Sequence, residues 1–131
     1  MKGSLLYGLV IADIHFCKKD DEGLYARLKK YFIAKIEEEK DDLDYIVIAG
    51  DLFDRILKWN EIGSNIVLRF IEELIGLSIK YDFKIRILKG TKTHDFNQLN
   101  NFKYLESYSI HLHTIRIFHH AFFLLSNRLV L

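Results

Sequence analysis

Apolar and polar positions along the chain form short apolar runs that alternate with segments of helical periodicity. Leu5–Ala12 and Tyr45–Ala49 are continuous apolar runs, which are typical of core strands buried inside a sheet. Phe83–Leu88 instead alternates apolar with basic residues, and this predicts a strand nearer the edge. Between these runs, Asp21–Lys40 and Glu61–Lys80 repeat apolar residues with a period of about 3.6, which predicts two amphipathic helices.

Each predicted helix has a candidate cap and an apolar side. Asp20 or Asp21 can cap the first helix and Asn60 the second, because short polar side chains accept hydrogen bonds from the first free amides. Farther along, about 97–107 predicts a short helix, and 111–118 is a candidate for one more strand. The predicted inward residues are Leu24, Leu28, Tyr31, Phe32 and Ile36 in the first helix, Ile62, Ile66, Val67, Phe70, Ile71, Leu74 and Ile75 in the second, and Leu99, Phe102 and Leu105 in the third.

Strands and helices that alternate in this order predict a parallel sheet, because parallel strands need long crossover connections. The expected fold class is therefore α/β, a layered parallel or mixed sheet flanked by helices. We expect one main domain over residues 1–110. Residues 111–131 are apolar without a clear period, and we interpret them as an atypical tail, a truncated or altered end, through which self-association is expected.

The composition is that of a globular protein, with 50% hydrophobic and 28% charged residues. The net charge of +1 gives no overall attraction to nucleic acid, so binding to a polyanion has to come from a local patch or a bound metal. Cys17 is the only cysteine, which excludes an internal disulfide and favours a cytoplasmic location. No apolar run reaches the roughly 20 residues that cross a bilayer, so we expect a soluble protein.

Polar side chains follow each of the three predicted strands, and the carboxyl ends of strands are where open α/β sheets build their sites. Carboxylates together with imidazole suit manganese, iron or zinc. If Asp51 bridges two ions about 3.5–4 Å apart, the pair can hold a hydroxide and neutralise charge on a phosphoryl group. His94 can then act as a general acid, oriented by Asp95, with Asp54 supporting the ligands. The six residues are Asp13 and His15, then Asp51 and Asp54, then His94 and Asp95.

Several of these side chains also fit a purely structural interpretation. Asp13 with His15, or the turn 50–55 taken alone, would fit a solvated or salt-bridged loop, whereas all three motifs in this order favour a metal site. Cys17 could be a soft metal ligand, but we prefer to interpret it as a small buried thiol. Trp59 could stack on a nucleic-acid base, but we prefer packing within its loop. Basic residues near the expected site are either a phosphate-binding edge or solvated loop positions: Lys18, Lys19, Arg55, Lys58, Lys89 and Lys92.

The three motifs resemble those of a known family. Asp13-x-His15, Gly50-Asp51-x-x-Asp54-Arg55 and Gly90-x-x-x-His94-Asp95 look like the first three motifs of the calcineurin-like metallophosphoesterases, D-x-H, GD-x-x-DR and GNH[DE]. Within this family, the SbcD-type DNA-repair exonuclease branch is similar to this chain in two places. One is the stretch 48–55, and the other is the G-T-x-T-H-D form of residues 90–95 together with residues 96–99 that follow it. The resemblance covers about residues 5–107, and it implies the N-terminal part of a calcineurin-like metallophosphoesterase fold.

The resemblance also implies roles for individual residues. Asp13, His15 and Asp51 correspond to ligands of the first metal, with Asp51 as the bridge to a second ion, and His94 corresponds to the catalytic histidine. The family usually uses manganese, so a two-ion Mn²⁺ site is implied. The implied activity is a metal-dependent phosphodiesterase, a DNA exonuclease in which a metal-bound hydroxide attacks phosphorus. DNA is then the expected substrate, and an ATPase subunit is an expected partner.

Two departures from the family pattern keep other hypotheses open. Thr93 stands where the family has a metal-binding asparagine, and we place it with Asp54 and Arg55 among the residues that support the ligands. The family's later histidines, a lone one and a G-H-x-H, lack a counterpart, because His111-x-His113 has no preceding glycine and comes too early. We interpret that pair, and the pair 119–120, as non-ligands. The alternatives are a truncated, non-catalytic fragment that retains partial metal or DNA binding, and a phosphatase that acts on a small phosphoester.

Overall fold

The computed structural model describes most of the chain up to residue 99 and one later strand. The described residues are 5–58, 62–91, 94–95, 98–99 and 115–118, of which 62–64 and 115–118 are described by their backbone alone. Thr93, Trp59, Lys92, the cap position Asn60 and most of the short helix predicted over 97–107 lie outside the described residues.

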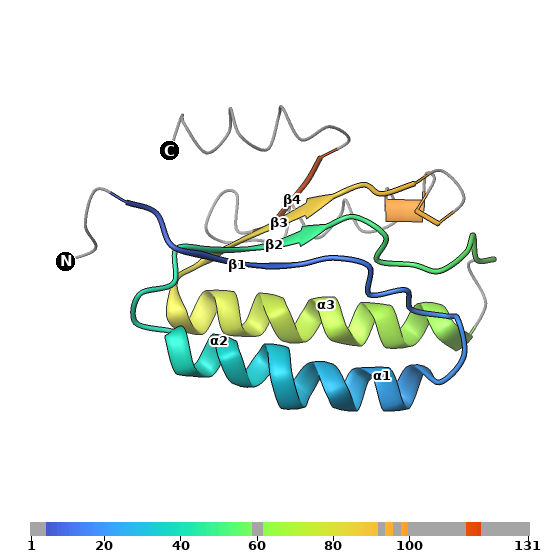
Figure 1. The fold of residues 1–131 in the computed structure, drawn as a ribbon, viewed down its shortest axis with the longest axis horizontal. Coiled ribbons are helices and arrows are strands. Elements are labelled where there is room, and N and C mark those ends of the chain that lie inside the picture. Colours follow the sequence, from blue (N-terminus) through green and yellow to red (C-terminus); the bar gives the residue numbers. More distant parts are fainter. Residues whose placement is uncertain (1–4, 59–61, 92–93, 96–97, 100–114, 119–131) are drawn as a thin grey trace.

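Four strands form one parallel sheet (Figure 1). They are β1 (Gly8–Ile11), β2 (Tyr45–Ala49), β3 (Lys84–Leu88) and β4 (Ile115–Phe118), and they lie side by side in the order β1-β2-β3-β4. Each neighbouring pair is parallel, with Ile48 opposite Ile11 on one side and Ile87 on the other. The predicted α/β class with a layered sheet is confirmed, and the candidate strand within 111–118 is present as β4.

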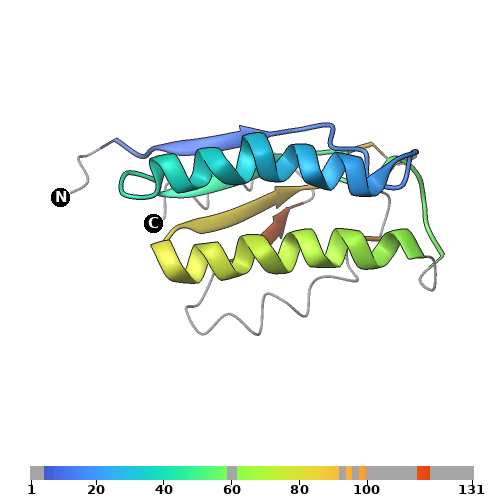
Figure 2. The same cartoon turned by 90° about the horizontal axis from the view of Figure 1, so that it is seen from below.

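Two long helical segments cover one face of the sheet (Figures 1 and 2). The first is α1 (Asp21–Leu28), which continues without interruption through a π-helical stretch, η1 (Lys29–Ile33), into α2 (Ala34–Glu39). The second is α3 (Ile62–Tyr81). Asp20 caps α1, because its carboxylate accepts a hydrogen bond from the Gly23 amide. Within the described part of the chain, no helix is long and apolar enough to cross a membrane.

One predicted inward residue of the first helix, within the π-helical stretch, is exposed. Tyr31 was expected on the apolar side, but it is 65% exposed, whereas Phe32 and Ile33 are buried. The buried positions 25, 28, 32 and 36 keep a spacing of three or four residues through this stretch, and Tyr31 lies one position off that stripe.

The core lies between the sheet and the helices. Ile46 and Ile48 of β2 are fully buried, as are Phe70 and Leu74 of α3. The predicted inward stripe of α3 is confirmed at 66, 67, 70, 71 and 74, where each side chain is buried in the same cluster. Burial of an aliphatic or aromatic side chain stabilises by about 1.5–3 kcal/mol, so this face fixes how the helices lie on the sheet.

Two strands lie differently from their predicted places. β1 was expected inside the core, but among the described strands it is an edge, and Val10 is 66% exposed. β3 was expected nearer the edge, but it lies between β2 and β4, and its Arg86 is buried. The basic residues of β3 thus do not mark a solvent-facing edge strand. The Arg86 guanidinium donates a hydrogen bond to the Ile85 carbonyl oxygen, which supplies a polar partner inside the protein.

Candidate metal centre

The loops that follow β1 and β2 continue side by side beyond the ends of the strands. The amides of Asp13, His15 and Phe16 donate to the carbonyl oxygens of Gly50, Asp51 and Leu52 over 3.1, 3.1 and 2.9 Å. Side chains alternate along the first loop: Ile14 and Phe16 are buried, while Asp13 and His15 point away from the core. Backbone hydrogen bonds thus place the first predicted motif against the second.

The three predicted metal ligands share an unusual backbone conformation. The φ angles are +54° at Asp13, +56° at His15 and +52° at Asp51, and Cys17 has +73°. This left-handed region is uncommon for residues with a side chain, and such strain tends to occur at functional sites. The three residues lie just beyond β1 and β2, at the same end of the sheet.

Asp13, His15 and Asp51 offer one ligand atom each, and these atoms all lie within 4.8 Å of one another. The Nδ1 atom of His15 lies 3.1 Å from a carboxylate oxygen of Asp54. A carboxylate only accepts hydrogen bonds, so Nδ1 carries the proton and Nε2 keeps its lone pair. A histidine that donates its other ring N–H to a carboxylate is the usual arrangement of a metal ligand, so this set fits a divalent cation.

Asp51 lies between the ends of β2 and β3. Its Oδ1 atom accepts two hydrogen bonds from Thr91, one from the amide at 2.7 Å and one from the hydroxyl at 3.1 Å. Burial raises the pKa of Asp51, but the Thr91 hydrogen bonds together with His94 and His15 outweigh it and hold the pKa below its usual value. The anionic form that a cation requires is therefore the favoured one.

The close approach of these two strand ends depends on glycine. A Cβ atom on Gly90 would lie 2.1 Å from Oδ1 of Asp51 and 2.2 Å from its backbone nitrogen. Gly50 has a φ of +97°, and a Cβ atom on it would lie 3.2 Å from the Cα atom of Gly90. Any larger residue at position 90 would push Thr91 away from Asp51.

The Asp95 carboxylate makes other contacts than the predicted one with the His94 ring. Its carboxylate is fully buried and accepts hydrogen bonds from three backbone amides, those of Asp51 (2.9 Å), Phe53 (3.1 Å) and Gly90 (2.6 Å). Burial raises its pKa, although the three amides act in the opposite direction. The expectation that Asp95 orients the His94 ring is replaced by an anchoring position, in which one side chain joins the loops that follow β2 and β3.

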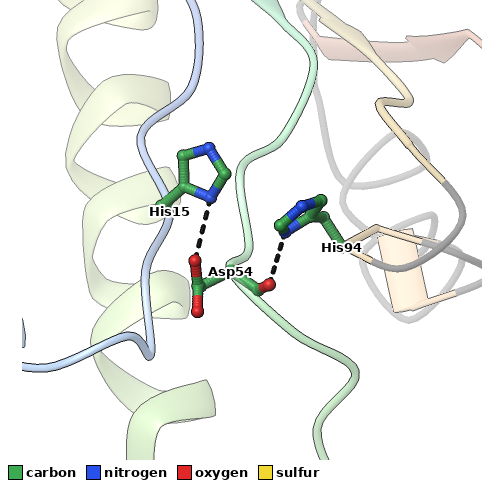
Figure 3. A group of neighbouring side chains, drawn as sticks. All are labelled: His15, Asp54 and His94. Atoms are coloured by element: carbon green, nitrogen blue, oxygen red, sulfur yellow. Dashed lines mark hydrogen bonds and ion pairs between the residues drawn. The ribbon is translucent and has the colours of Figure 1, made fainter.

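His94 is held by the main chain of the second motif (Figure 3). Its Nδ1 atom contacts the backbone carbonyl oxygen of Asp54, whose carboxylate binds His15. The two imidazole rings meet edge to face, with centroids 4.8 Å apart. Because a carbonyl oxygen only accepts, Nδ1 of His94 carries a proton and Nε2 is left for another partner. His15, Asp54 and His94 also form a second group with ligand atoms within 4.8 Å of one another. In this group the Asp54 carboxylate is already paired with Nδ1 of His15, which favours the set with Asp13 and Asp51 as the cation site.

Gln98 is a supporting residue that the sequence motifs did not indicate. Its side-chain amide donates to the carbonyl oxygens of Arg55 (2.9 Å) and His94, and its oxygen accepts from the Leu57 amide at 3.0 Å. Gln98 is buried, so these bonds tie the loop that follows β2 to the turn that carries His94. Gln98 belongs to the stretch 96–99, which is part of the family resemblance. Its spacing from the motif residues indicates no role, because its partners are all main-chain groups.

The remaining predicted residues are placed as follows. Arg55 is exposed and lies beyond the acidic turn, where its carbonyl oxygen binds Gln98. Cys17 is buried, in agreement with its interpretation as a small core thiol, and its amide donates to the Asp21 carboxylate at 2.7 Å. Thr91 was not among the predicted residues. Its position directly after Gly90 was the available signal, since the motif glycine brings the next residue against Asp51.

Comparison with known proteins gives one family. The sequence model of the calcineurin-like phosphoesterases matches residues 9–118, which include all but the first residue of β1, the other three strands and all the residues of the candidate site. Neither the curated proteins nor the solved structures contain a match.

Proposed function

The chain belongs to the calcineurin-like phosphoesterase family, and on this premise we propose that it is a metal-dependent phosphodiesterase that digests DNA as an exonuclease. The family match and the Asp13, His15 and Asp51 group support a metal-dependent phosphoesterase. The choice of DNA rests on the likeness of 48–55 to repair nucleases. The observation that carries the proposal is the convergence of three strand-end motifs on a single ligand set with His94 beside it.

We assign the cation to Asp13, His15 and Asp51. Carboxylate and imidazole ligands suit manganese, iron or zinc, and we propose Mn²⁺ because the family resemblance implies it. When bound, such a cation supplies Lewis-acid chemistry, which activates water and neutralises charge on a phosphoryl group. Asp54 keeps the His15 ring in the tautomer whose Nε2 can bind the cation. Asp95 and Gly90 keep Asp51 at the junction of the two loops.

His94 is assigned to the substrate rather than to the cation. With Nδ1 fixed by the Asp54 carbonyl oxygen, its Nε2 atom is the ring position left for a phosphoester oxygen. When Nε2 is protonated, it can donate a hydrogen bond to the phosphoryl group and pass a proton to the leaving oxygen. Asp54 therefore supports both histidines, through its carboxylate for His15 and its carbonyl for His94.

Basic side chains at the same end of the sheet support a polyanionic substrate. Lys18 and Lys19 are exposed on the loop that follows β1, and Arg55 and Lys58 are exposed on the loop that follows β2. Lysine and arginine that neutralise phosphates provide most of the sequence-independent affinity for DNA. We therefore expect binding that weakens steeply as the salt concentration rises.

The test is a nuclease assay on the full 131-residue chain with Mn²⁺. Linear duplex and linear single-stranded DNA are compared with a covalently closed circle, which has no ends for an exonuclease. Release of nucleotides from linear DNA alone, lost in Asp51→Asn, is the expected result. Hydrolysis of p-nitrophenyl phosphate without hydrolysis of bis-p-nitrophenyl phosphate or DNA would favour a phosphatase for small phosphoesters. Mn²⁺ binding without turnover of any substrate would favour the non-catalytic alternative.

A further inference from the structure

Thr91 makes two hydrogen bonds to the same oxygen of Asp51. Its amide lies 2.7 Å and its hydroxyl 3.1 Å from Oδ1. Two donors on one carboxylate oxygen occupy the lone pairs that lie on that side, so Oδ1 is satisfied by the protein. The other oxygen, Oδ2, receives neither of these hydrogen bonds, and Asp51 offers one carboxylate oxygen to the group with Asp13 and His15.

The Thr91 hydroxyl is not needed to build its own loop. The backbone there is held by other groups: the Thr91 carbonyl oxygen accepts from the His94 and Asp95 amides at 3.1 and 2.9 Å, and the Gly90 amide donates to Asp95. Thr91 is exposed, so its methyl group contributes little to the core. Within the part of the chain that the structure describes, the contact found for the hydroxyl is the one to Asp51, which points to a purpose in the site rather than in folding.

We propose that Thr91 is a positioning residue for the metal centre, which fixes the rotation of the Asp51 carboxylate so that Oδ2 alone is presented to the divalent cation. This inference rests on the proposed function, in which Asp51 binds the cation. A carboxylate held by two donors loses little rotational freedom when the cation binds, because it is already ordered. Groups of this kind around metal ligands commonly change metal affinity by 10–100-fold when they are removed.

The experiment compares Thr91→Val with Thr91→Ser in the full chain. Valine has nearly the shape of threonine but lacks the hydroxyl, whereas serine keeps it. The affinity for Mn²⁺ is measured by calorimetry, and the paramagnetic resonance spectrum of bound Mn²⁺ reports the geometry of its ligands. We expect Thr91→Val to bind Mn²⁺ about tenfold more weakly with a changed spectrum, and Thr91→Ser to match the wild type in both. Thermal unfolding without metal should be the same for all three proteins.

Two kinds of result overturn the inference. Equal affinity and an equal spectrum in Thr91→Val would show that the hydroxyl does not position Asp51. Weaker binding accompanied by a lower melting temperature without metal, or not restored by serine, would assign Thr91 to folding of the loop. The proposed function fails separately: if the wild type binds no Mn²⁺, or if Asp51→Asn binds as tightly as the wild type, the assignment of the ligands is wrong and the inference falls with it.

Discussion

Asp95→Asn should lower the free energy of unfolding of the metal-free protein by about 2–3 kcal/mol. The amide of asparagine has one acceptor oxygen, whereas the buried carboxylate receives three amides on two oxygens. The more favourable orientation of the asparagine side chain places its oxygen at the Oδ2 position, where the amides of Asp51 and Gly90 donate. The new NH₂ group then faces the Phe53 amide. One buried N–H then loses its acceptor, which costs about 1–3 kcal/mol, and the other two bonds lose their charged partner.

Removal of the charge offsets part of this cost, because burial raises the pKa of Asp95 and so opposes the anionic form. We therefore place the net loss in the range above rather than at the sum of three charged hydrogen bonds. For a small domain, whose stability is commonly 5–15 kcal/mol, the loss is a large share but leaves the protein folded.

The assay is urea unfolding followed by circular dichroism, without metal, for wild type, Asp95→Asn and Asp42→Asn. Asp42 is exposed, so the same chemical change there should cost no more than about 0.5 kcal/mol. The midpoint of Asp95→Asn should fall by roughly 1–2 M urea with an unchanged slope. A shift as small as that of Asp42→Asn would refute the anchoring role, and an equal, large loss in both variants would indicate a general effect of charge.

Three further predictions concern the ligands, the substrate histidine and the helix interface. Asp51→Asn should weaken Mn²⁺ binding, measured by calorimetry, more than any other single substitution, because it removes the charge of the carboxylate at the junction of the two loops; equal affinity in both proteins would contradict the assignment. His94→Ala should lower turnover while Mn²⁺ affinity stays within a few-fold, since its role is on the substrate oxygen; loss of the metal would instead make His94 a ligand, in the group with His15 and Asp54. Tyr25→Phe should cost about 1–2 kcal/mol at pH 7, because the hydroxyl that donates to the Glu73 carboxylate is lost. Burial and Glu73 raise the pKa of Tyr25, so this advantage of the wild type is present below about pH 10 and is lost as the pH rises through the raised pKa. Urea unfolding of the two proteins at pH 7 and at a pH above 10 checks this: the difference in stability between them should be smaller at the higher pH.

The fold and the place of the site were predictable because both follow from periodicity. Continuous apolar runs and 3.6-residue repeats gave β2 and α3 nearly to the residue, and the rule that carboxyl ends of parallel strands share one edge brought Asp13, His15 and Asp51 together. The exception on the first helix, Tyr31, lies in the π-helical stretch. Residues 31–33 are three consecutive apolar residues, so the sequence pattern alone does not decide which of them face the sheet, and the structure buries 32 and 33.

The partners of the site residues were less predictable, because most of them are main-chain groups. Asp95 follows His94 in sequence, so a side-chain pair was the natural expectation, but its carboxylate binds the amides of Asp51, Phe53 and Gly90. Every residue carries an amide, so no residue type marks which amides a carboxylate will find. The same holds for the contact of His94 with the Asp54 carbonyl oxygen.

The three strand-end loops differ in what they contribute to the site. The loops that follow β1 and β2 carry the candidate ligands, and these are left-handed residues, each of which costs free energy that the folded structure has to offset. The loop that follows β3 supplies the restraints: Gly90 allows the close approach, Asp95 holds the amide of Asp51, and Thr91 holds its carboxylate. A strained geometry persists only where surrounding contacts determine it. Backbone hydrogen bonds between the first two loops, together with the contacts of the third loop to Asp51 and Phe53, supply those contacts. The effects of Asp95→Asn and Thr91→Val should therefore separate, the first appearing as lost stability and the second as lost metal affinity, although both residues act on Asp51.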